Sequence, residues 1–170
     1  IGSWYYTPSW VRTPLPQHCT PEDLASVGAQ WLFFADSSGL AAQMAQRLAA
    51  AGQRAILVER GACFEKLGHL NYVINPGAQQ DYITLILELK NEGWTPGKIV
   101  HCWTISETSS DGLSNDFDLQ QELGLYSLLF LTQAVSAEFL NEAVEYLVIS
   151  NALHIVNGNE TIQPGKSTIL

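Results

Sequence analysis

The sequence predicts an α/β protein in which a parallel sheet carries helices on both faces, preceded by an extended N-terminal arm. Short apolar runs, typical of strands buried on both faces, alternate with segments whose apolar residues recur at helical spacing. The segments between the runs are long enough for right-handed crossovers, which place successive strands parallel. This alternation is typical of a truncated Rossmann-like domain.

The first predicted unit is a strand, a turn, a helix and a second strand. Residues 31–35 form a wholly apolar run, and the polar turn 36–39 follows. Apolar residues then recur on one helical face over 40–48, and Gly52 ends this helix. The apolar run 55–58 predicts the second strand.

The middle of the chain repeats this alternation. Residues 70–74 predict a third strand, which the turn residues 75–77 stop. A helical face follows over 82–89 and is closed by Gly93, and 98–103 predicts the fourth strand.

The last third predicts a long helix, a strand and a short helix. After a polar loop over 106–115, the pattern predicts a helix over 116–134. Its second half, 128–131, is apolar on all sides, so we expect all four side chains to be largely covered, by the sheet on one side and by another helix or a partner on the other. Residues 146–150 predict the fifth strand, and Pro164 is placed to open a final helix.

Composition and charge exclude several classes of protein. Of the 170 residues, 46% are hydrophobic and 15% are charged, which is too few charges for a disordered chain. The net charge of −9 argues against a nucleic-acid partner, and no apolar run is long enough to span a membrane. No Lys or Arg occurs between Lys98 and Lys166, while nine acids do. We expect this acidic part to be a solvated face; the alternative is a face that meets a basic partner.

The cysteines and histidines do not form a metal-binding pattern. Cys19, Cys63 and Cys102 are few and scattered, and their odd number argues for a reducing compartment. His18 and His101 each precede a cysteine directly, and adjacent residues of a strand point to opposite faces. Neither a C-x-x-C nor an H-x-x-x-H spacing occurs, and no secretion signal is visible. We therefore expect no metal and a cytoplasmic location.

The arm, residues 1–30, precedes a degenerate Rossmann-like domain over 31–170. It contains four aromatic residues in seven positions, more apolar area than an isolated domain normally exposes. Our hypothesis is that it forms an interface with a segment outside this chain; the alternative is that it packs on its own domain. The proposed interface residues are Trp4, Tyr5, Tyr6, Pro8 and Trp10.

The turn after the first strand lacks the features of a nucleotide site. Dinucleotide-binding turns need several glycines, because the backbone must touch the diphosphate at a helix N-terminus. Here only Gly39 is present, and the carboxylate of Asp36 stands at the phosphate position. Glu59, after the second strand, is in a position to bind a ribose, although we interpret it as a surface acid. We therefore expect no NAD(H) or NADP(H) site.

Catalytic patterns are also missing. A short-chain reductase uses a tyrosine whose pKa is lowered by a lysine four residues later, and a hydrolase of this fold class needs G-x-S-x-G. The sequence has no G-x-S-x-G, and we interpret His101 and His154 as structural. The tyrosines that lack a lysine at this spacing are Tyr72, Tyr82, Tyr126 and Tyr146. We therefore assign no catalytic, cofactor-binding or metal-binding residue.

Several motifs, in order along the chain, resemble one family. They are Tyr6-Thr7-Pro8-Ser9-Trp10, Pro14-Leu15-Pro16, residues 31–36 with 39–41, Val100-His101-Cys102-Trp103, residues 126–134, Ser150-Asn151-Ala152-Leu153, Gly158-Asn159-Glu160 and residues 164–168. Together they resemble the N-terminal half of ketoreductase domains in modular polyketide synthases, over essentially the whole chain.

The resemblance implies two joined halves, both similar to short-chain dehydrogenases/reductases. The N-terminal half is structural and non-catalytic, and it supports a C-terminal half that holds NADPH and the Ser-Tyr-Lys/Asn chemistry. That half reduces a carrier-protein-bound β-ketoacyl intermediate, and it and the neighbouring synthase domains are the expected partners. Two alternatives stay open. One is that the chain is a stand-alone small-molecule-binding or reductase domain with an atypical turn. The other is that it is the structural half of an inactive ketoreductase.

Overall fold

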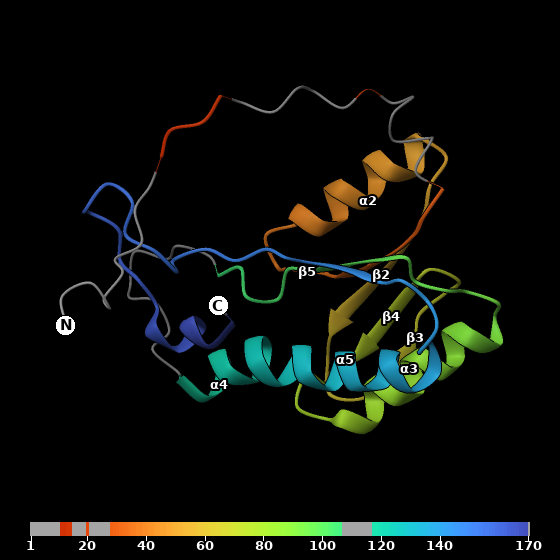
Figure 1. Ribbon diagram of the computed structural model, residues 1–170. Coiled ribbons are helices and arrows are strands. Elements are labelled where there is room, and N and C mark those ends of the chain that lie inside the picture. The colour runs from red at the N-terminus through yellow and green to blue at the C-terminus, as the bar shows by residue number, and fades with distance from the viewer. Residues whose placement is uncertain (1–10, 15–19, 21–27, 107–116, 170) are drawn as a thin grey trace.

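The computed structural model describes residues 11–14, 20, 28–106 and 117–169. Figure 1 shows the arrangement of its helices and strands. In chain order they are β1 (Gln30–Phe34), α2 (Leu40–Ala50), β2 (Arg54–Arg60), β3 (Glu65–Lys66), β4 (Asn71–Ile74), α3 (Gln79–Asn91), β5 (Lys98–His101), α4 (Phe117–Gln121), η2 (Glu122–Tyr126), α5 (Ser127–Glu138), β6 (Glu145–Val148) and η3 (Pro164–Ile169). Of these, η2 is a π-helix and η3 a 3-10 helix.

The six strands form one sheet in the order β3-β4-β2-β1-β5-β6. Every neighbouring pair is parallel except β3 and β4, which are antiparallel. The five predicted strands are present within a few residues of their expected bounds, so the parallel sheet is confirmed. The two-residue strand β3 was not predicted, because Glu65 and Lys66 are both exposed and carry no apolar alternation.

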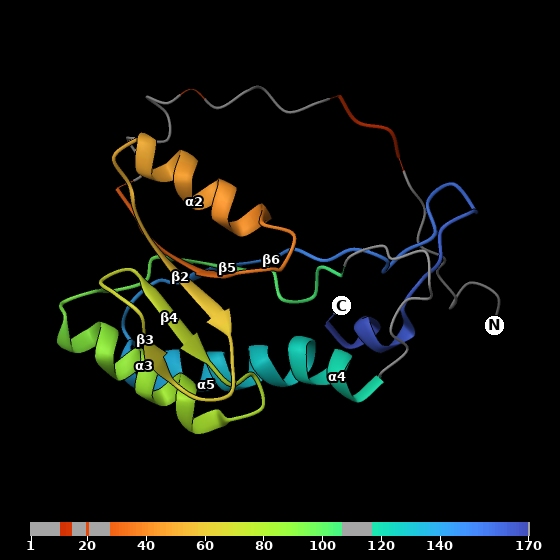
Figure 2. The same cartoon turned by 180° about the vertical axis from the view of Figure 1, so that it is seen from behind.

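Helices cover both faces of the sheet, as predicted for a Rossmann-like domain. Figures 1 and 2 show α2 on one face and α3 with α5 on the other. Strand β1 divides its side chains between the two sides: Phe33 packs with the residues of α2, whereas Leu32 and Phe34 join those of α3 and α5. All three are fully buried. The wholly apolar sequence of β1 follows from this double coverage.

The predicted long helix is present over α4, η2 and α5, but the described residues do not cover all four side chains of 128–131. Leu131 is fully buried and Leu128 and Phe130 are half-buried, whereas Leu129 is 45% exposed. Because α5 packs against the sheet and α3 on one side, the opposite side of the helix has no cover in the part of the chain that the structure describes. An apolar sequence on all sides therefore did not produce burial on all sides.

One edge of the sheet is formed by β6, which pairs with β5 alone among the described strands. Two of its four residues, Leu147 and Val148, are apolar and 48% and 37% exposed.

None of the helices in the described ranges combines the length and apolar character needed to cross a membrane. The division at residues 30 and 31 stays a prediction, since most of the arm lies outside the described residues.

Candidate functional site

The turn between β1 and α2 holds a carboxylate where a dinucleotide-binding domain needs free backbone N–H groups. Asp36 is buried, and its Oδ1 accepts a hydrogen bond from the Ala41 N–H at 2.9 Å. Its Oδ2 accepts from the Leu40 N–H at 3.2 Å and also from the Ser38 hydroxyl. Gly39, with φ +85°, adopts the left-handed conformation that favours glycine. The first N–H groups of α2 are therefore bonded to the protein's own carboxylate.

The hydrogen bonds keep Asp36 ionised. Burial alone would raise the pKa of its carboxyl group, but the bonds donated by Ala41, Ser38 and Leu40 outweigh burial, and the pKa lies below its ordinary value of 3.8. At neutral pH the turn thus carries a negative charge at the positive end of the helix. A phosphate at this position would meet a like charge and N–H groups that are already bonded.

Glu59 lies close to this turn. It is exposed near the end of β2 and lines a small pocket of about 220 Å³ together with Asp36, Ser37 and Arg60. Cofactor pockets are typically larger, from about 300 Å³ upward. Two acidic side chains therefore line the region where a nucleotide would bind in a functional Rossmann domain.

Three tyrosines, of which Tyr72 and Tyr82 are buried and Tyr146 is half-buried, are held in their neutral form. Burial raises the pKa of Tyr72, Tyr82 and Tyr146, the reverse of the shift that a catalytic tyrosine needs. The Tyr82 hydroxyl donates to the Pro76 carbonyl at 2.9 Å. The ammonium of Lys66 lies 5.8 Å from the centre of the Tyr72 ring, but it forms ion pairs with two glutamates rather than with the phenol.

His101 and Cys102 point to opposite faces of the sheet, as predicted. The His101 Nε2 lies 2.9 Å from the Ser127 Oγ, and Cys102 is buried on the side of α2. Burial lowers the pKa of His101 to about 3, so the ring is neutral at physiological pH. The structural interpretation agrees with this geometry, except that Nδ1 has no partner among the described residues. The other histidine considered, His154, is exposed.

Ser127 links this histidine to the π-helix η2. Its hydroxyl lies 2.8 Å from the Leu123 carbonyl and 3.1 Å from the Gly124 carbonyl, groups that the widened turn leaves available. A Cβ at Gly124 would lie 2.9 Å from the Ile169 Cγ2, so glycine allows η3 to approach η2 closely. Ser127, one of the motif residues, and Gly124 are thus explained by packing and hydrogen bonding.

A buried lysine joins η3 to the loops after β5 and β6. Lys166 is 3% exposed and donates to the Ser106 Oγ and the Asn151 Oδ1, both at 2.9 Å. Burial lowers the pKa of its ammonium group to about 8. Its ammonium group donates to acceptors in the loops after β5 and β6, so this lysine holds η3 against these loops.

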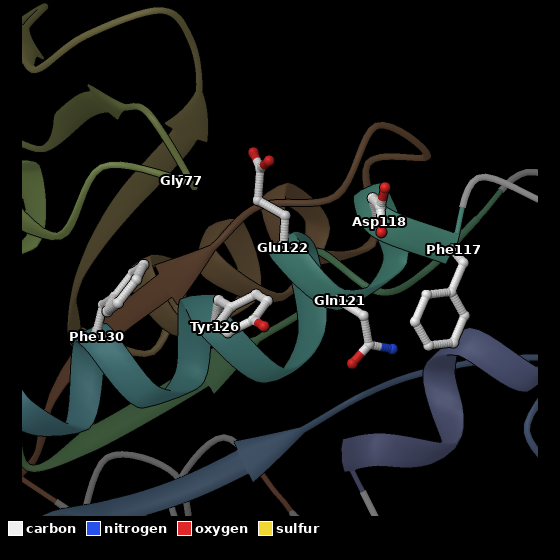
Figure 3. A pocket seen from close by; sticks show the side chains of 7 residues that line it. All are labelled: Gly77, Phe117, Asp118, Gln121, Glu122, Tyr126 and Phe130. Carbon is white, nitrogen blue, oxygen red and sulfur yellow. The ribbon is translucent and has the colours of Figure 1, made fainter.

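A larger pocket lies along the helix formed by α4, η2 and α5. Figure 3 shows this groove, which has a volume of about 520 Å³. Its lining residues are Gly77, Phe117, Asp118, Gln121, Glu122, Tyr126 and Phe130. We call it the acidic–aromatic groove, because carboxylates and aromatic rings line it together.

This groove was not predicted from the sequence. Its main signal was available, since Asp118, Glu122, Tyr126 and Phe130 recur every four residues along one helical face. The contribution of Gly77, from the loop after β4, depends on the tertiary fold.

The proposed interface residues, Trp4 to Trp10, lie outside the described residues. Among the described residues, no three His, Cys, Asp or Glu side chains form a group that could hold a metal.

Comparisons with known proteins agree with the fold. A solved structure described as the adenylation, ketoreductase and pseudo Asub multidomain structure of a keto acid-selecting NRPS module is 26% identical, with a TM-score of 0.78, over 95% of this chain and 13% of that one. An N-terminal ketoreductase from the macrolactin assembly line is 24% identical, with a TM-score of 0.63, over 72% of this chain and 25% of that one. This chain thus spans a small part of each. No curated protein sequence matches it.

The resemblance found in the sequence is confirmed: the chain has a Rossmann-like fold and is similar to a part of two structures that contain a ketoreductase. The family model described as beta-ketoacyl synthase-like, N-terminal, matches residues 30–168. Its description refers to a synthase, whereas both similar structures contain a ketoreductase. Since the match covers most of the sequence, the chain belongs to the beta-ketoacyl synthase-like, N-terminal family.

Proposed function

We propose that this chain is the non-catalytic structural half of a polyketide synthase ketoreductase. It supports a catalytic half that binds NADPH and reduces a carrier-protein-bound β-ketoacyl intermediate. Its partners are that catalytic half and the neighbouring domains of the synthase. The similarity to two ketoreductase-containing structures of assembly-line proteins supports this assignment.

The observation that carries the proposal is the carboxylate of Asp36 at the start of α2. It occupies the N–H groups of Leu40 and Ala41 and adds a negative charge where a diphosphate would need both. The chain keeps the Rossmann-like architecture without the features that bind a cofactor, as expected when the architecture itself is the function.

A supporting observation is the uncovered face of η2 and α5. Leu125 and Leu129, four residues apart, are 38% and 45% exposed along this helix. Neighbouring apolar side chains on one face of a domain are typical of an interaction surface. We propose that the catalytic half covers this face.

Cofactor stoichiometry tests the first part of the proposal. We expect the 170-residue chain to show no NADPH binding below millimolar concentration by calorimetry. A ketoreductase containing both halves should bind one NADPH per polypeptide. Micromolar binding to this chain alone would overturn the non-catalytic assignment.

The proposed contact between the catalytic half and the uncovered face of η2 and α5 can be tested by comparing one substitution in two contexts. Leu129→Ser should cost less than about 1 kcal/mol in the isolated chain, because the residue is already half exposed. In a protein that contains both halves, it should cost clearly more. Leu140→Ser is the matched control, since Leu140 is 81% exposed and lies beyond α5. Equal costs of Leu129→Ser in both contexts would show that this face is not the contact.

A further inference from the structure

The acidic–aromatic groove has no role in the proposed function, which rests on the Asp36 turn and on the uncovered face of η2 and α5. Figure 3 shows the side chains of Asp118 and Glu122 leaving the helix on the same side, with the rings of Tyr126 and Phe130 farther along it. The loop after β4 borders the groove at Gly77. A Cβ at Gly77 would lie 3.2 Å from the carboxyl carbon of Glu122, so the glycine allows this loop to approach the carboxylate closely.

The two carboxylates are four residues apart, and like charges at this spacing destabilise a helix. None of the ion pairs among the described residues includes either of them. No Lys or Arg occurs in the sequence between Lys98 and Lys166 to offset them locally. Among the described residues that line the groove, none carries a positive charge.

The aromatic part of the groove is well supported. The Tyr126 and Phe130 rings are stacked with their centres 6.3 Å apart, and Phe130 also contacts the buried Tyr82 ring at 5.9 Å. Tyr126 itself is 46% exposed. A ring held in this way offers a fixed face to a flat or cationic group.

Other ligand classes fit less well. An anion would be repelled by both carboxylates. Among the described residues, no three His, Cys, Asp or Glu side chains form a group that could hold a divalent metal, and Gln121 uses its Nε2 to donate to the Gly165 carbonyl. A purely apolar segment would bury two charges without pairing them, which is costly.

We propose that the acidic–aromatic groove binds an arginine side chain presented by the surface of a partner protein. A guanidinium group donates two parallel hydrogen bonds to one carboxylate and stacks on an aromatic face, whereas a lysine ammonium is a compact point charge. The groove supplies two carboxylates and the Tyr126 ring on one side of one helix. This inference does not depend on the proposed structural role in a ketoreductase.

The test uses the 170-residue chain and a small probe. We would titrate N-acetyl-arginine amide into the ¹⁵N-labelled chain and follow the amide signals by NMR. N-acetyl-citrulline amide is the control probe, because it has nearly the same shape and no charge. We expect the arginine probe to shift the signals around Gly77, Glu122 and Tyr126 and the citrulline probe to leave them unchanged.

Matched variants separate the groove from the general acidity of the chain. Glu122→Gln and Glu142→Gln each remove one negative charge, but Glu142 is exposed and outside the groove. Losing a hydrogen bond to a charged group should weaken binding by about tenfold in Glu122→Gln, with little change in Glu142→Gln. Asp118→Asn, at an exposed position, is a second variant if Glu122→Gln perturbs folding.

Two results would overturn recognition of the probe's charge by the groove, and a third would overturn the choice of arginine. One is the same pattern of shifts with the citrulline probe, which would indicate stacking without charge recognition. The other is equal weakening in Glu122→Gln and Glu142→Gln, which would indicate attraction to the acidic surface as a whole. Binding of the lysine analogue, N-acetyl-lysine amide, as tightly as the arginine probe would overturn the choice of arginine.

Discussion

Replacing Asp36 with alanine is the most informative perturbation of the domain, because this carboxylate stands where a dinucleotide-binding turn would hold the phosphates. The substitution removes the acceptor for the Leu40 and Ala41 N–H groups and for the Ser38 hydroxyl. Replacing a side chain that bonds the first N–H groups of a helix by alanine costs about 1–2 kcal/mol. For a chain of this size, that corresponds to a fall of roughly 2–8 °C in Tm.

The cost should depend on pH in a defined direction. The pKa of Asp36 is lowered in the folded protein, so its ionised form stabilises the fold. This contribution is fully present above the ordinary value of 3.8 and is lost as pH falls through the lower pKa of the folded state. The stability difference between wild type and Asp36→Ala should therefore be constant from pH 7 to about 5 and should shrink below about pH 4.

Urea denaturation followed by circular dichroism at several pH values provides the measurement. Asp36→Asn is the companion variant, because it keeps a side-chain oxygen and loses the charge. It should cost less than Asp36→Ala at pH 7. A cost below about 0.5 kcal/mol for Asp36→Ala, or a cost that does not change between pH 7 and 3, would refute the reasoning.

Three further predictions concern packing and a buried charge. Leu131→Ala should lower the free energy of unfolding by about 2–5 kcal/mol, and Leu129→Ala by less than about 1, as measured in urea; similar costs would contradict the observed orientation of α5. Burial lowers the pKa of Lys166 to about 8, so the unfolded chain holds this proton more tightly and the Lys166 contribution to stability should rise from pH 8 to 10. Lys166→Met should lack that rise when it is compared with wild type at each pH. Gly124→Ala should cost about 1–3 kcal/mol in thermal unfolding, because its Cβ would lie 2.9 Å from Ile169; an unchanged Tm would contradict the tight approach.

The fold was largely predictable from the sequence because its signals are local. The run 31–35 is apolar without interruption because β1 is covered on both faces, and the stripe over 40–48 has the spacing of α2. The parallel sheet follows from crossover geometry rather than from any single residue. The short strand at Glu65 and Lys66 has no such signal, since only its pairing with β4 defines it.

The sites were predictable in part. The sequence alone predicted that the Asp36 carboxylate stands where a nucleotide's phosphates would bind. Its hydrogen bonds to the Leu40 and Ala41 N–H groups are seen only in the folded turn. The exposure of Leu129 could not be predicted, because an apolar sequence gives the same pattern whether its cover lies within the chain or outside it. The acidic–aromatic groove needs Gly77, which is distant from the helix in sequence.

The edge formed by β6 has a consequence for handling the domain by itself. Its outer backbone N–H and C=O groups have no strand partner among the described residues, and Leu147 and Val148 are exposed beside them. Natural proteins protect such edges with charges or a covering segment, because an open edge templates strand addition between molecules. The ion pair of Lys98 and Glu145 places charged side chains only at the start of this strand. Oligomers that form through β6, and not global unfolding, should therefore set the concentration limit of the isolated chain.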